Sequence, residues 1–95
     1  MKVLIIDDER SIRNTLKEIL EFEGHEVATA EDGKQGVDKA QADNYDAIFC
    51  DIKMPVMDGN EVLATLVAAG CESPIIMISG HGDIDTAVKC IKNGA

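Results

Sequence analysis

Acidic side chains follow two of the short apolar runs in this 95-residue chain, at the point where each run ends. Residues 7–9 (Asp-Asp-Glu) come directly after the run 3–6, and Asp51 comes directly after the run 47–50. Carboxylates that are brought together repel one another and are pushed toward protonation unless a cation joins them. Oxygen ligands with room left for water suit Mg²⁺ better than a closed Ca²⁺ site. A carboxylate beside Mg²⁺ can also attack phosphorus and form an aspartyl phosphate.

Each of these residues, taken alone, also has a purely structural interpretation. Asp7 and Asp8 precede a helical pattern, and they would then cap that helix and complement its dipole. Asp51 would be a loop residue, and Ser79, which follows the apolar run 75–78, would be a turn residue. The chemical interpretation depends on all of them standing at strand ends that lie side by side.

The apolar pattern predicts strands that alternate with helices along the chain. Predicted strands cover residues 3–6, 26–29, 47–50 and 74–78, of which the second is the weakest. Apolar residues at helical spacing follow each strand, and Gly24 and Gly70 are the expected stops of the first and third helices. The last predicted helix covers residues 84–91. Such alternation predicts an α/β fold whose parallel sheet is covered on both faces, with ligands beyond the carboxyl ends of its strands.

Composition limits the classes of function. The formal net charge of −9 argues against nucleic-acid binding, which needs clustered Lys and Arg. The first apolar run is too short for a secretory signal, and no apolar window is long enough to span a membrane. Three cysteines at spacings that suit no metal site indicate reduced thiols, so we expect a cytoplasmic protein without a membrane partner.

Four stretches together resemble the receiver domain of two-component response regulators. They are VLIIDDE at residues 3–9, DIKMPVMDG at 51–59, PIIMISG at 74–80 and AVKCIKNGA at 87–95. They stand in the family's order and spacing and cover the whole chain, so we expect one receiver domain over residues 1–95. The resemblance implies a flavodoxin-like, doubly wound parallel sheet of strand order 2-1-3-4. Residues 79–95 are most similar to receivers of nitrogen-regulation-type transcriptional activators.

The resemblance also implies roles for the acidic residues. Asp51 stands at the position of the phosphoryl acceptor, which takes its phosphoryl group from a sensor histidine kinase. Asp8 stands where a carboxylate binds Mg²⁺ directly, and Asp7 where its neighbour acts through water. Lys53 occupies the position whose backbone carbonyl is a metal ligand. The chain would therefore be a signalling module rather than an enzyme.

Further positions match residues that read or tune the phosphoryl group. Ser79 resembles the hydroxyl residue that swings toward the phosphoryl group and senses it. The Lys53 side chain and His81 stand where the family tunes the rate at which water removes the phosphoryl group. Cys50 precedes the acceptor, but strand alternation directs it to the opposite face, so we expect it in the core. Gly59 is expected to serve the backbone conformation before the third helix.

The chain departs from the family pattern at its C-terminal end. The pattern continues with a fifth strand that ends in a lysine and with a fifth helix, and this chain has neither. Lys89 and Lys92 lie on the last predicted helix and do not replace that lysine. Without a fifth strand, residues 75–78 form an exposed apolar edge. The chain is then a fragment of a longer natural protein, a deliberate truncation, or a domain whose missing unit is supplied by a partner or by a second copy. For the last case we expect pairing, including as a homodimer, through residues 75–78 or the last predicted helix.

Two other functions compete with the signalling receiver. Because the lysine of the fifth strand is missing, the residues that contact the phosphoryl group are incomplete. This leaves open a docking or dimerisation module that works without phosphorylation. A metal-dependent phosphatase with an aspartate nucleophile fits poorly, because residues 7–11 (DDERS) do not follow its Asp-x-Asp-x-Thr pattern. Lys53 also stands where such an enzyme, if Asp51 were its nucleophile, would need a general-acid aspartate. Mg²⁺-dependent phosphoryl uptake would separate the receiver from the docking module.

Overall fold

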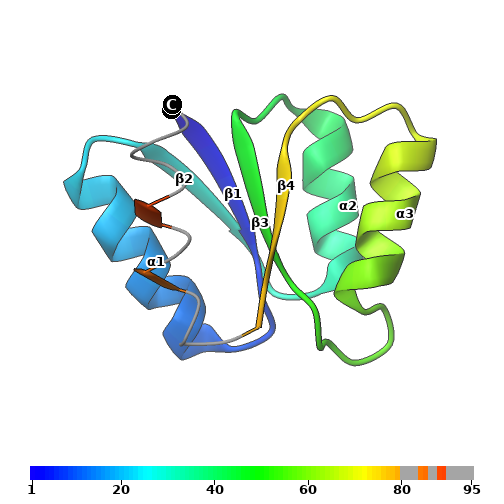
Figure 1. Cartoon of the computed structure of the whole chain (residues 1–95), viewed down its shortest axis with the longest axis horizontal. Helices are drawn as coiled ribbons and strands as arrows, with labels where there is room; N and C mark the ends of the chain where they lie inside the picture. Colours follow the sequence, from blue (N-terminus) through cyan, green and yellow to red (C-terminus); the bar gives the residue numbers. More distant parts are fainter. Residues whose placement is uncertain (80–83, 86–87, 90–95) are drawn as a thin grey trace.

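The computed structural model describes residues 1–79, 84–85 and 88–89. Its elements are β1 (Lys2–Ile6), α1 (Arg10–Phe22), β2 (Glu26–Ala30), α2 (Gly33–Ala42), β3 (Ala47–Asp51), α3 (Gly59–Ala68) and β4 (Ile75–Ile78). The four strands of this described part are parallel and lie in the order β2-β1-β3-β4. Helix α1 covers one face of the sheet, and α2 and α3 cover the other (Figure 1). The predicted doubly wound, flavodoxin-like order 2-1-3-4 is confirmed, and the described elements include no fifth strand or fifth helix.

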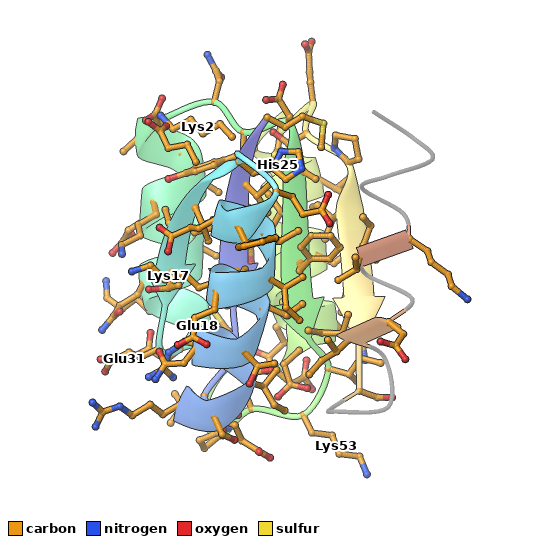
Figure 2. The ribbon with its side chains drawn as sticks, turned by 90° about the vertical axis from the view of Figure 1, so that its left-hand side faces the viewer. Lys2, Lys17, Glu18, His25, Glu31 and Lys53 are labelled. Carbon is orange, nitrogen blue, oxygen red and sulfur yellow. The ribbon has the colours of Figure 1, made fainter. Side chains whose placement is uncertain are left out.

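Helix α1 packs on one face of the sheet (Figure 2) and ends where its glycine predicts. Figure 2 looks onto this helix with the strands behind it. Its buried stripe consists of Ile12, Leu16 and Leu20. Gly24 follows the helix with φ of 91°, and the N–H of His25 donates to the oxygen of Leu20 over 3.0 Å. The same arrangement closes α3 at Gly70, so both glycine stops are confirmed.

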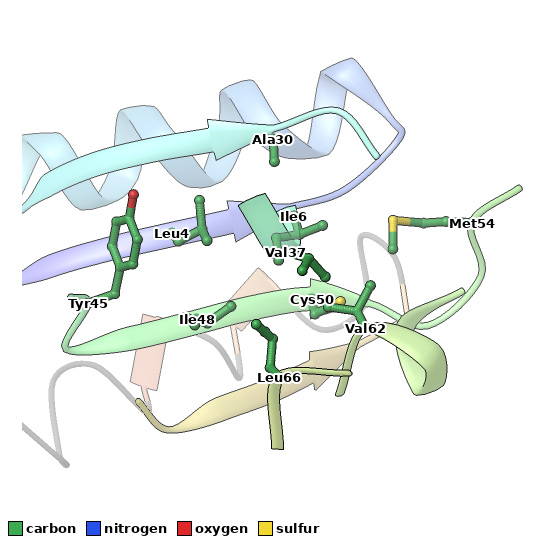
Figure 3. Packing of buried hydrophobic residues seen from close by; sticks show 10 residues of the cluster. All are labelled: Leu4, Ile6, Ala30, Val37, Tyr45, Ile48, Cys50, Met54, Val62 and Leu66. Carbon is green, nitrogen blue, oxygen red and sulfur yellow. The ribbon is translucent and has the colours of Figure 1, made fainter. Parts of the chain in front are cut away.

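The two central strands separate two apolar clusters. Alternate side chains of β1 and β3 point to opposite faces, because successive strand residues do so. The cluster on the α1 side includes Val3, Ile5 and Phe49. The cluster under α2 and α3 includes Leu4, Ile6, Ile48 and Cys50 (Figure 3). Both strands are buried along nearly their whole length, which explains why their sequences read as unbroken apolar runs.

Strand β4 is less deeply buried than its neighbour β3. Ile78 is buried, but the three residues before it are only partly covered. Ile84 and Val88, from the last predicted helix, pack against the cluster on the α1 side. Most of that helix, residues 84–91, lies outside the described residues. Among the residues that the structure describes, no helix is both long enough and apolar enough to cross a membrane.

Candidate functional site

Three carboxylates converge at the carboxyl ends of β1 and β3. These strands are neighbours, with Ile6 in register with Cys50. Asp7 follows the end of β1, Asp8 comes next, and Asp51 ends β3. One carboxylate oxygen of each of these three residues lies within 4.8 Å of the other two. The strand ends therefore bring together the acidic residues that the sequence places there.

Asp7 is fully buried, and only part of its carboxylate is satisfied. Its Oδ1 accepts a hydrogen bond from the N–H of Glu9 over 2.8 Å. Its Oδ2 is buried and has no hydrogen-bond partner among the described residues. Burial raises the pKa of Asp7, and the nearby charges of Asp8 and Glu9 add to this, while the Glu9 N–H opposes it. A buried carboxylate oxygen without a donor is a position that a cation would stabilise.

Asp51 is also buried close to the other carboxylates. Burial, followed by the charge of Asp7, raises the pKa of Asp51 to about 7, and Asp8 adds to the shift. A main-chain hydrogen bond from Lys53 lowers this pKa and offsets only part of the rise. The cluster offers oxygen atoms only, which are the ligands of a hard cation such as Mg²⁺. The residues present therefore fit a divalent cation.

The capping interpretation of Asp7 and Asp8 is wrong. The residue before α1 is Glu9, and it makes no side-chain hydrogen bond that caps the helix. The carboxylate of Asp7 bonds to the Glu9 N–H, before the helix begins, and Asp8 is exposed beside it. The first turn of α1 also carries no acidic residue that would complement its dipole.

Of the remaining predicted site residues, Ser79 and Lys53 lie at the same end of the sheet. Asp51 is in register with Ile78, and Ser79 follows directly as an exposed residue. The side chain of Lys53 is exposed and extends away from the ribbon (Figure 2). The metal-binding role of the Lys53 carbonyl stays a prediction. His81 lies outside the described residues.

The expectation for Gly59 is wrong in its reason. Its φ is not in the left-handed region. A Cβ at this position would instead lie 2.3 Å from the main-chain oxygen of Asp51 and 2.8 Å from the Cα of Ile52. Gly59 is therefore required by close packing beneath the acceptor. The expectation for Cys50 is confirmed, because it is fully buried on the opposite face and burial raises its pKa to about 12.

Sequence reasoning places a turn at Met54-Pro55 between Asp51 and α3, but it missed the left-handed conformation of Val56 within that turn. The N–H of Met57 donates to the oxygen of Pro55 over 2.8 Å, which encloses Val56 in a three-residue turn. Val56 has φ of 68° and is fully exposed. A β-branched residue is rarely found at positive φ, so its residue type gave no signal for this turn. The capping box that starts α3 was readable, since Asp58 and Glu61 stand three residues apart.

Comparisons with known proteins agree with this geometry. The family model described as "Response regulator receiver domain" matches residues 3–95. The cell cycle transcriptional regulator CtrA of Caulobacter vibrioides is 40% identical over 95 residues, which is 100% of this chain and 41% of that protein. The C4-dicarboxylate transport transcriptional regulatory protein DctD of Pseudomonas aeruginosa is 39% identical over 99% of this chain and 20% of its own length.

Solved structures show the same fold. The response regulator TrrA of Thermotoga maritima, in complex with Mg²⁺ and BeF, is 33% identical with a TM-score of 0.79, covering 95% of this chain and 78% of that one. The receiver domain of the hybrid histidine kinase CckA, at 24% identity, has a TM-score of 0.80 and covers 97% of this chain and 96% of that one; this likeness concerns the fold alone. This chain spans less than half of each of the two curated relatives. It belongs to the response regulator receiver domain family.

Proposed function

We propose that this chain accepts a phosphoryl group on Asp51 from a sensor histidine kinase, in a reaction that depends on Mg²⁺, and thereby switches a protein-interaction surface. One observation carries the proposal. Asp51 lies within a cluster of three carboxylates at the carboxyl end of a parallel sheet, and one buried oxygen of this cluster has no partner among the residues that the structure describes. Family membership supports the same function.

The cluster supplies the ligands for the cation. Asp8 and Asp51 would bind Mg²⁺ through their carboxylates, Asp7 would act through water, and Lys53 would add its main-chain carbonyl. When bound, Mg²⁺ would offset the negative charge of the site and polarise the phosphoryl oxygens. Each residue except Lys53 belongs to the group of three whose oxygens converge.

Phosphoryl transfer would make one bond and break one. A carboxylate oxygen of Asp51 forms the new bond to phosphorus, while the phosphorus–nitrogen bond to the donor histidine breaks and the leaving imidazole takes up a proton. A small acyl phosphate would donate in the same way, releasing its carboxylate. Asp51 is 7% exposed, so the chain shields the acceptor while leaving a route for the donor.

The switch would follow from the added charge. A phosphoryl group brings a charge of about −1.5 to −2 and three acceptor oxygens to the end of β3. Ser79, directly after the β4 residue in register with Asp51, would donate its hydroxyl to them. The surface that changes would involve the predicted helix 84–91. Because CtrA and DctD are named as transcriptional regulators, we propose a role in transcription regulation, exerted from the cytoplasm. The nitrogen-regulation subtype stays a prediction.

Intact-mass measurement with Mg²⁺ and acetyl phosphate tests the proposal. We expect a phosphoryl adduct on the unchanged chain and none on Asp51→Asn. Asp43→Asn is the matched control, because Asp43 is an exposed aspartate near the amino end of β3, and it should still take up the phosphoryl group. A folded, unchanged chain without an adduct would overturn the proposal in favour of a docking module that works without phosphorylation.

The outer edge of β4 favours pairing with another chain. The N–H of Ile48 donates to the oxygen of Pro74, and that of Ile52 donates to the oxygen of Ile78. The main-chain N–H and C=O groups of successive strand residues point alternately to the two neighbouring strand positions, so those of Ile75 and Met77 point away from β3. No strand of the described residues pairs with them. We propose that a second copy or a partner strand does so; a chain that sediments as a monomer at every concentration and with every candidate partner would contradict this.

A further inference from the structure

One cationic side chain reaches back to the connection that carries the acidic pair. Arg13 lies near the start of α1, and its Nη1 donates a 2.8 Å hydrogen bond to the main-chain oxygen of Asp7. Arg13 is half-buried, whereas Arg10, one turn earlier on the same helix, is exposed. The Arg13 side chain therefore spans the connection between β1 and α1, which consists of residues 7–9.

Asp7 is held at three atoms, and Arg13 supplies one of the three contacts. The main-chain N–H of Asp7 donates to the oxygen of Ala30 over 3.2 Å, and its Oδ1 accepts from the N–H of Glu9. The contact from Arg13 to the Asp7 oxygen is the third, and the only one of the three whose donor is a side chain. Glu9 makes no side-chain hydrogen bond that caps the start of α1. The contact from Arg13 therefore constrains a connection that lacks the usual capping hydrogen bond.

The choice of acceptor matters for a cation site. Arginine pairs readily with carboxylates, often through two hydrogen bonds, and would then occupy the oxygens that a metal needs. Arg13 bonds to a main-chain carbonyl instead, and it forms no ion pair within the part of the chain that the structure describes. It can therefore fix the position of Asp7 while leaving the Asp7 Oδ2 available.

We propose that Arg13 is a positioning residue for the cation site: it holds the connection 7–9 so that the carboxylates of Asp7 and Asp8 face Asp51. This inference rests on the proposed function, because it concerns the same site. The positioning role and a purely electrostatic role of Arg13 predict opposite changes in metal affinity when Arg13 is replaced. A cation close to the cluster repels Mg²⁺, so loss of its charge by itself would tighten metal binding, whereas loss of positioning weakens it.

Metal binding by the full chain tests this inference, with Mn²⁺ as the probe because free Mn²⁺ can be counted by electron paramagnetic resonance. We expect Arg13→Met to bind Mn²⁺ roughly five- to tenfold more weakly, which is less than the full value of a hydrogen bond from a charged donor, because the metal-free chain loses that bond as well. Arg13→Lys keeps a donor and should recover most of the affinity. Arg10→Met removes the same charge from the same helix and should bind equally or slightly more tightly.

The possible outcomes separate this inference from the proposed function. An Arg13→Met chain that binds Mn²⁺ as tightly as the unchanged chain, or an Arg13→Lys chain no better than Arg13→Met, would overturn the positioning role. An unchanged chain that binds no Mn²⁺ would overturn the metal site itself. Circular dichroism verifies folding, and if Arg13→Met does not fold, Arg13→Gln, which is too short to span the connection, replaces it with the same expectation.

Discussion

At the amino end of the sheet Asp43 is paired with Lys2, whereas at the carboxyl end Asp51 lies beside two further carboxylates. The consequences for the two aspartates are opposite. The hydrogen bond from Lys2 lowers the pKa of Asp43, while burial and the charge of Asp7 raise the pKa of Asp51 to about 7. Both residues stand close to a strand terminus, so the difference comes from the burial of Asp51 and from the charge of the neighbours of each aspartate.

The comparison shows how one fold uses the same residue type for two purposes. At the amino end, Lys2 also lies 3.8 Å from Glu26 and over the ring of Tyr45, so part of the acidic charge is matched within the chain. At the carboxyl end, the cluster has no lysine or arginine ion pair within the described residues. Charge that the chain matches itself contributes to the fold, and charge that it leaves unmatched provides a place for a cation.

Adding Mg²⁺ should produce the largest change, and only through the carboxyl end. At a concentration about 100-fold above the dissociation constant, binding to the folded chain alone raises the free energy of unfolding by about 2.7 kcal/mol. Thermal melting with and without Mg²⁺ measures this. Asp51→Asn should lose most of the effect, and Asp43→Asn should keep it. Equal loss in both variants would place the bound cation elsewhere.

Removing a carboxylate should have opposite effects on stability at the two ends. Without metal at pH 7.5, we expect Asp51→Asn to raise the free energy of unfolding by on the order of 1–2 kcal/mol, because a buried charge among like charges is removed. Asp43→Asn should lower it slightly. Urea unfolding in the presence of a chelator measures both. A lower stability for Asp51→Asn would show that a partner within the chain already compensates for its charge.

The pH dependence of the free energy of unfolding, measured without metal, should be dominated by the carboxylates at the carboxyl end of the sheet. Asp51 has a folded-state pKa of about 7, above its ordinary value of 3.8. Between these values the folded chain retains a proton that the unfolded chain has released, so the free energy of unfolding falls as pH rises through this range. Asp7 shifts in the same direction. Urea unfolding from pH 4 to pH 8 should show the decline, with a smaller slope in Asp51→Asn.

Breaking the pair at the amino end should have the smallest effect. Lys2 and Asp43 are both substantially exposed to solvent, so Lys2→Met should lower the free energy of unfolding only slightly, by less than any of the changes above. Phosphoryl uptake and the Mg²⁺-induced shift in melting temperature should be unchanged. Comparison of urea midpoints at low and high salt would check this, since salt should abolish the difference. A change in phosphoryl uptake would show that the two ends are coupled.

The fold was predictable where short-range patterns determine it. Apolar runs identify the strands, Gly24 and Gly70 mark the ends of two helices, and the alternation of elements predicts a parallel sheet. The meeting of Asp7, Asp8 and Asp51 then follows from the position of each at a strand end. In this part of the molecule, local sequence and tertiary structure favour the same arrangement.

The features that could not be predicted depend on contacts between distant segments, or they oppose the backbone preference of the residue type. The need for Gly59 comes from the main-chain oxygen of Asp51, which only the folded chain brings close. The bond from Arg13 to Asp7 depends on one rotamer across a short connection. The left-handed φ of Val56 opposes the preference of its residue type, so no pattern announces it.

The position of Tyr45 decides what optical spectroscopy can report about this protein. The chain has no tryptophan, and Tyr45 is its sole tyrosine, so its tyrosine emission comes from a single ring. That ring is buried near Lys2, at the end of the sheet opposite the carboxylates. The intensity of this emission should therefore change when the chain unfolds. It should stay constant when an ion or a phosphoryl group binds and has only a local effect. A change in emission on phosphorylation would be direct evidence that the event reaches the far side of the domain.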